Sequence, residues 1–62
     1  MTKQEKDMWI INIENSAAMV CDKYGSAVAN SVFQRHGASS IYNLSPSTYS
    51  EVFADLEQIA ND

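Results

Sequence analysis

The segment from Leu44 to Ala60 carries the complete signal for one amphipathic helix. Ser45 suits the N-cap, and Pro46 follows at the first helical position, where its missing N–H leaves no helical bond unmade. Apolar residues then recur at helical spacing, within about a third of the helical wheel. They are Tyr49, Val52, Phe53, Leu56, Ile59 and Ala60. The sequence therefore predicts a helix over about residues 46–60.

The first third of the chain predicts a longer helix, over about residues 3–24. Thr2 followed by Glu5 is typical of a capping box, and Gly25 can adopt the left-handed conformation that ends a helix. Gly25 either breaks a longer helix or bends it, and we favour a break. The residues that share one apolar face are Trp9, Ile13, Ser16, Ala17, Val20 and Tyr24.

A second, shorter helix is predicted over about residues 26–36. Ser26 is a suitable N-cap, and Gly37 is a suitable terminator. The face that we expect to point into the core consists of Val28, Ala29, Val32, Phe33 and His36.

The connection to the last helix should contribute to the core as well. Ile41 and Leu44 are expected to be buried, with room for an extra helical turn near 39–44. Leu44 and Tyr49 also have the spacing of a hydrophobic staple. Strand-like alternation is absent from the sequence, which predicts an all-α fold. We expect a compact three-helix bundle that forms one small domain over residues 1–62.

A chain of 62 residues supplies a net stability of only about 3–5 kcal/mol. Chains of this size often gain stability by cross-linking or by oligomerisation. Cys21 is the only cysteine, so an internal disulfide is excluded. The unpaired thiol and the polar beginning of the chain favour a cytoplasmic location. The longest apolar run, Met8–Ile11, is far too short to span a membrane, so no membrane association is expected.

The formal net charge of −4 is unevenly distributed. Residues 1–44 balance four basic against four acidic side chains, whereas residues 45–62 carry four acidic side chains and no basic one. Scattered basic residues make nucleic-acid binding improbable. The acidic residues Glu51, Asp55 and Asp62 form either a solvated face, which we favour, or a docking face for a basic partner.

The sequence predicts no catalytic, cofactor-binding or metal-binding residues. His36 is the only histidine, and a helix-terminal histidine more often stabilises the helix dipole than catalyses a reaction. Cys21 has no helix N-terminus beside it to activate a thiolate, so a buried inert thiol is expected. Phosphate-binding loops and zinc-type spacings are missing from the sequence. We therefore expect a protein that is not an enzyme and has no small-molecule substrate.

The first helix carries a second apolar strip, outside the face expected to be buried. A monomeric bundle would leave this strip in water, and an exposed strip indicates a partner surface. A protein partner or a second copy, as in a homodimer, would cover it. The candidate interface consists of Met8, Ile11, Asn12, Asn15 and Met19.

From Trp9 to its end, the chain resembles short proteins encoded on integrative and conjugative elements of Firmicutes. The resemblance is carried by residues 11–17, 24–26, 32–38 and 49–62. It implies a bacterial cytoplasm and an accessory role in conjugation or in defence against host restriction. It carries over no functional residues.

Two functions are consistent with these observations. The first is a non-enzymatic protein-interaction module of a mobile element that associates with itself. The alternative is a small DNA-associated regulator, in which helices joined at Gly37 imitate a helix-turn-helix. The acidic last helix disfavours this alternative, which would need Lys3 and Lys6 to contact phosphates.

Overall fold

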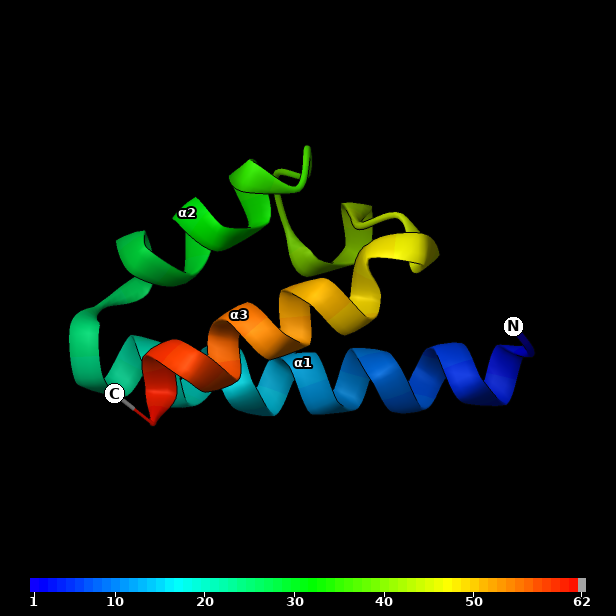
Figure 1. The fold of residues 1–62 in the computed structure, drawn as a ribbon, viewed down its shortest axis with the longest axis horizontal. Helices are drawn as coiled ribbons and strands as arrows, with labels where there is room; N and C mark the ends of the chain where they lie inside the picture. The colour runs from blue at the N-terminus through cyan, green and yellow to red at the C-terminus, as the bar shows by residue number, and fades with distance from the viewer. Residues whose placement is uncertain (62) are drawn as a thin grey trace.

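Three α-helices and two single 3₁₀ turns make up most of residues 1–61, the part of the chain described by the computed structural model (Figure 1). No strand occurs among these residues. The elements are α1 (Lys3–Tyr24), α2 (Ser26–Arg35), η1 (Ile41–Asn43), η2 (Pro46–Thr48) and α3 (Tyr49–Ala60). The prediction of an all-α three-helix bundle is confirmed.

The helices α1 and α3 run in the same direction, and α2 runs in the opposite direction, from the end of α1 back toward the start of α3 (Figure 1). Of the helix pairs, α1 and α3 share the most extensive contact, and α2 and α3 the least. Where α1 and α3 end together, the Lys23 ammonium donates a hydrogen bond to the Ala60 carbonyl. A cation at this position interacts favourably with the C-terminal end of the α3 dipole.

The start of α1 is held by the predicted capping box. The Glu5 amide donates to Thr2 Oγ1 over 3.1 Å, and the Thr2 amide donates to Glu5 Oε1 over 3.3 Å. This end of α1 reaches beyond the start of α3 (Figure 1), and every residue from Lys3 to Met8 is exposed. The first turns of α1 are therefore stabilised mainly by their own hydrogen bonds.

Gly25 interrupts the helix between α1 and α2, as we favoured. Its φ of 95° and ψ of 160° lie in a region that is essentially restricted to glycine. Its amide still donates to the Cys21 carbonyl over 2.9 Å, which closes the last turn of α1. The prediction of Ser26 as an N-cap is wrong: Gly25 takes that position, and no side-chain hydrogen bond caps α2.

The end of α2 is a Schellman motif around Gly37. The Ala38 amide donates to the Phe33 carbonyl and the Gly37 amide to the Gln34 carbonyl, each over 3.0 Å. Gly37 has the positive φ, 79°, that this motif requires. The helix ends at Arg35, with His36 as C-cap, one residue earlier than predicted.

The start of the last helix is tighter than predicted. Pro46–Thr48 forms a 3₁₀ turn, and α3 proper begins at Tyr49. Ser45 acts through its carbonyl, which accepts from the Thr48 amide at 2.9 Å and from Thr48 Oγ1 at 2.7 Å, and not as a side-chain cap. Leu44 and Tyr49 are both buried, as the hydrophobic staple requires.

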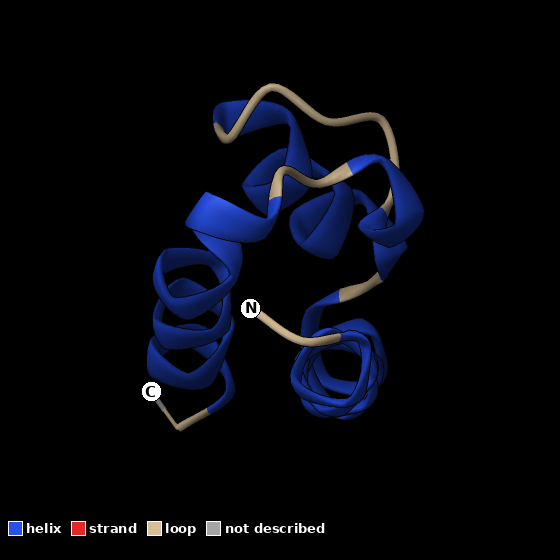
Figure 2. Ribbon diagram, turned by 90° about the vertical axis from the view of Figure 1, so that its right-hand side faces the viewer, coloured by secondary structure: helices blue, strands red, loops and turns tan. Residues whose placement is uncertain are grey.

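The buried apolar residues come from all three helices and from the connection that contains η1. Figure 2, turned by 90° from Figure 1, shows the helices arranged around a common centre. Ile41 and Leu44 are buried as predicted. Tyr24 was expected in the core but is 47% exposed, because it lies at the end of α1, where the chain turns away at Gly25. The buried apolar residues are Ile13, Val20, Ala29, Val32, Phe33, Ala38, Ile41, Leu44, Tyr49, Val52, Leu56 and Ala60.

Trp9 and Phe53 close one edge of this core. Both side chains are half-buried, and their rings meet edge to face with centroids 5.9 Å apart at 71°. Such pairs add roughly 0.5–1.5 kcal/mol beyond the area they bury. Trp9 therefore marks the point where the core ends and the exposed side of α1 begins.

Candidate functional site

The structure brings the five predicted interface residues together on one exposed side of α1. We call this set, Met8, Ile11, Asn12, Asn15 and Met19, the α1 strip. Its three large apolar side chains are 58%, 56% and 44% exposed in chain order, and its two asparagines are exposed as well. A surface helix ordinarily carries charged and polar residues outside its buried face. Within residues 1–61, no other segment buries these three apolar side chains, so the α1 strip presents them to solvent.

A shallow hollow adjoins the α1 strip. It has a volume of about 240 Å³ and is lined by Glu5, Met8, Trp9 and Asn12. Small-molecule sites usually measure about 300–1,000 Å³ and enclose most of their ligand. An open hollow of this size fits one protruding side chain better than a substrate. The sequence did not predict this hollow, because its shape depends on how the side chains of its lining residues are placed in the folded chain.

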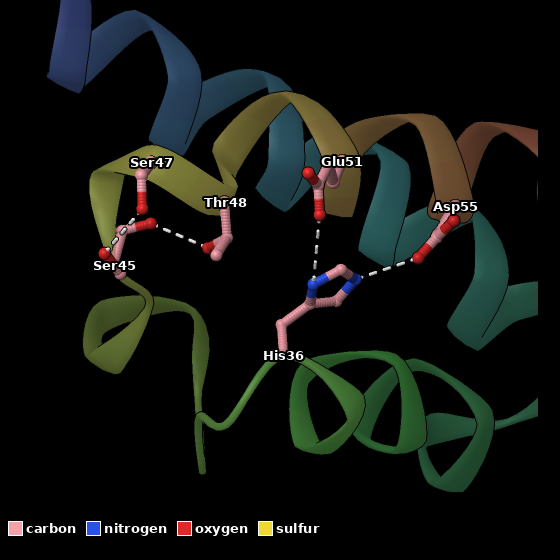
Figure 3. Close-up of polar contacts among 6 residues, drawn as sticks. All are labelled: His36, Ser45, Ser47, Thr48, Glu51 and Asp55. Atoms are coloured by element: carbon pink, nitrogen blue, oxygen red, sulfur yellow. Dashed lines mark hydrogen bonds and ion pairs between the residues drawn. The ribbon is translucent and has the colours of Figure 1, made fainter.

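A second cluster joins α2 to α3, and Figure 3 shows it. The His36 side chain is 14% exposed, and its Nε2 lies 2.9 Å from Oδ2 of Asp55. Its Nδ1 lies 3.9 Å from Oε2 of Glu51, whose side chain is 72% exposed. An ionised carboxylate only accepts hydrogen bonds, so with Asp55 ionised the contact requires the tautomer in which Nε2–H donates the hydrogen bond to Oδ2.

This cluster contains the carboxylate orienter that sequence analysis did not find. Residues 51 and 55 lie one turn apart on α3, and His36 ends α2, but only the tertiary arrangement brings them together. A histidine oriented by a carboxylate also occurs in enzymes, where it faces a nucleophile. The nearby hydroxyls are engaged elsewhere: Ser45 Oγ pairs with Ser47 Oγ at 3.1 Å, and Thr48 Oγ1 donates to the Ser45 carbonyl (Figure 3).

The predicted acidic docking face is only partly free. Glu51 is exposed, but Asp55 is partly covered and bonded to His36. Asp62 lies outside the described residues. Of the two described carboxylates of this face, Asp55 therefore joins α2 to α3, and Glu51 stays exposed to solvent.

Tyr42 and Glu14 form a third polar contact, between η1 and α1. The Tyr42 hydroxyl donates to Glu14 Oε1 over 3.0 Å. This hydrogen bond, and after it the negative charge of Glu14, raises the pKa of Tyr42 above its usual value of 10.0. Tyr42 is otherwise 79% exposed. The contact was not predicted, since the two residues lie 28 positions apart.

Among residues 1–61, no group of three or more His, Cys, Asp and Glu side chains is placed to hold a metal ion. Over the same residues, no helix has the length and apolar character needed to cross a membrane. Cys21 is half-buried and packs against the core.

The surface of residues 1–61 thus offers two distinct features, the α1 strip with its hollow and the His36 cluster. No protein-family model, curated protein or solved structure matches this chain. Function has to be inferred from these two features and from the chemistry of their residues.

Proposed function

We propose that this protein is a non-enzymatic interaction module that associates with itself through the α1 strip. The observation that carries the proposal is the exposure of Met8, Ile11 and Met19 on one side of a helix whose other side forms the core. Isolated exposed apolar residues are ordinary on protein surfaces. Three large ones in one strip, beside a hollow sized for a side chain, favour a protein partner.

A second copy of the chain is the simplest partner. Burying such a side chain fully is worth roughly 1.5–3 kcal/mol, and these are already about half-buried, so each contributes on the order of 1 kcal/mol. A symmetric pair buries six of them, which is comparable to the lower end of the association cost of about 4–15 kcal/mol. The dimer should therefore be weak and its formation strongly dependent on concentration.

The dimensions of α1 agree with weak association. A helix of 22 residues is about 33 Å long and about 10 Å wide, so one side offers about 300 Å² to a partner. Stable interfaces bury about 800 Å² from each partner. We accordingly expect the dissociation constant of the dimer to be about 1 mM.

The biological setting of the proposal comes from the resemblance described above. Short proteins of integrative and conjugative elements act in the cytoplasm of a bacterial host, and an accessory module there would act by binding proteins. We propose such a mobile-element role, and a cytoplasmic location, for this chain. A pull-down from host lysate that recovers a specific protein after nuclease treatment would support this setting.

Ile11→Lys tests the association directly. Ile11 is 56% exposed, so the substitution leaves the core intact while placing a charge in the α1 strip. Sedimentation equilibrium from about 10 μM to about 1 mM covers the expected affinity. Wild type should form dimers at the upper concentrations, and Ile11→Lys should stay monomeric. Asn30→Lys, an exposed change on α2, is the matched control and should dimerise like wild type.

Two results would contradict the proposal. If wild type stays monomeric throughout this range, self-association is absent. If Ile11→Lys dimerises as wild type does, the α1 strip is not the contact.

The alternative of a DNA-associated regulator has less support. The connection from α2 to α3 runs from His36 to Thr48 and contains the η1 and η2 turns. It is longer than the usual three- or four-residue turn of a helix-turn-helix. Two acidic residues of α3, Glu51 and Asp55, face His36. Binding to duplex DNA that weakens steeply with salt would nevertheless favour this alternative.

A further inference from the structure

Four residues of the α1 strip are arranged symmetrically along the helix. Met8, Asn12, Asn15 and Met19 follow one another at spacings of four, three and four residues, so the order of residue types is the same from either end. All four are exposed, and this spacing keeps them on one side of α1. A two-fold axis that passes beside α1, at the level between Ile13 and Glu14, would place Met8 of one copy opposite Met19 of the other, and Asn12 opposite Asn15.

We propose that two copies pair α1 against α1 in antiparallel orientation about this axis. The inference rests on the self-association proposed above and adds its geometry. Met8 of each copy then faces Met19 of the other, and Asn12 faces Asn15. Two-fold contacts are reciprocal, so each of these pairs occurs twice in the dimer.

In this arrangement, the side chain of Met19 of the second copy occupies the hollow beside Met8. Its walls, which include Trp9 and Asn12, combine an aromatic ring with an amide. Methionine is unbranched and flexible, fills irregular gaps well, and makes favourable sulfur–aromatic contacts. The hollow lies at only one end of the strip, and the antiparallel arrangement fills it in both copies at once.

The asparagines fix the register of this pairing. An amide side chain both donates and accepts hydrogen bonds, so Asn12 and Asn15 can satisfy each other across the axis. A shift by one turn would place an asparagine against a methionine and leave the amide without a partner. A single polar position in a helix–helix contact selects register in the same way.

Cysteine cross-linking distinguishes antiparallel from parallel pairing. In a Cys21→Ala background, which removes the native thiol, two single variants are prepared, Met8→Cys and Met19→Cys. A disulfide forms readily only when the two Cα atoms lie about 4.4–6.8 Å apart. Under mild oxidation near 1 mM, a concentration suited to a weak dimer, we expect a covalent dimer from the mixture of the two variants and little from either alone.

Asn30→Cys, on the exposed side of α2, serves as the control for random collision. Asn30→Cys should cross-link with itself and with each strip variant at the same slow rate, which is the rate of random collision. The three cysteine positions are exposed, but the shared Cys21→Ala change is half-buried, so circular dichroism of each variant is compared with wild type to check that it is folded.

The possible results distinguish a failure of the antiparallel geometry from a failure of self-association itself. Preferential cross-linking in the mixture supports antiparallel pairing. Efficient cross-linking of Met8→Cys with itself would overturn it in favour of parallel pairing, and self-association would stand. Variants that sediment as dimers without cross-linking would also overturn it. A monomeric wild type would overturn the self-association itself.

Discussion

Nε2 of His36 and Oδ2 of Asp55 lie 2.9 Å apart, and this bond joins the end of α2 to the middle of α3. The contact between these two helices is the least extensive of the three helix pairs. A polar bond at that boundary therefore does more to fix α2 than a similar bond would do between α1 and α3.

A double-mutant cycle on His36→Ala and Asp55→Ala should show this coupling. We expect a coupling free energy of about 1 kcal/mol, since one partly exposed hydrogen bond to a carboxylate is lost. Urea unfolding followed by circular dichroism measures it. The cycle of His36→Ala with Glu51→Ala is the matched control and should give a value near zero, because Glu51 is farther away and more exposed. Equal coupling in both cycles would contradict the assignment of Asp55 as the main partner.

Leu56→Ala should remove most of the stability of the domain. Leu56 is fully buried in α3, and such truncations cost roughly 2–5 kcal/mol, which approaches the whole margin expected for a chain of this size. Thermal melting at 222 nm checks this. Gln58→Ala, exposed on the same helix, should change stability by no more than about 0.5 kcal/mol. Unchanged melting of Leu56→Ala would show that this face of α3 is not core.

Gly25→Ala should destabilise the bundle through the backbone alone. A Cβ atom at this position would meet no atom within 4 Å, so no clash is introduced. The φ of 95° and ψ of 160° are nevertheless strained for alanine, at a cost of about 1–3 kcal/mol. Urea unfolding gives the loss. Ala27→Gly, on the exposed side of α2, should cost less, about 0.5–1 kcal/mol. A stabilising effect of Gly25→Ala would mean that the helix is not interrupted at Gly25.

Alkaline titration should reveal the contact between Tyr42 and Glu14. The pKa of Tyr42 is raised in the folded state, so the contact stabilises the fold below the unfolded pKa of 10.0 and is lost as the pH rises through the folded pKa. The difference in phenolate absorbance between wild type and Tyr42→Phe isolates this residue. The same difference in a Glu14→Gln background should titrate at lower pH. Identical midpoints in the two backgrounds would argue against the bond.

Local signals allowed most of the secondary structure to be predicted. Thr2 with Glu5, Gly25 and Pro46 act within one or two turns, so the helix boundaries they predict agree with the structure to within a few residues. Ser26 was predicted wrongly because α2 already begins at Ser26, which leaves Gly25, with its non-helical backbone, at the N-cap position. Tyr24 was predicted wrongly because helical spacing gives the direction of a side chain but not where the facing helix stops.

In the candidate site, too, features set by local sequence were predictable and features set by the arrangement of the helices were not. The α1 strip was predictable, since it follows from the positions left over once the core face of α1 is assigned. The bond from His36 to Asp55 and the bond from Tyr42 to Glu14 depend on how the helices are placed against one another. No local pattern in the sequence carries that information.

The overhanging first turns of α1 tie the proposed association to a folding equilibrium. Met8 belongs to the strip, yet the residues before it depend on the capping box of Thr2 and Glu5 rather than on the bundle. When these turns fray, the copy loses one end of its contact surface, and its apparent affinity falls in proportion to the population that stays helical. A second copy binding there would in turn order the segment. Thr2 can thus tune assembly from outside the contact, through the fraction of molecules that are competent to pair.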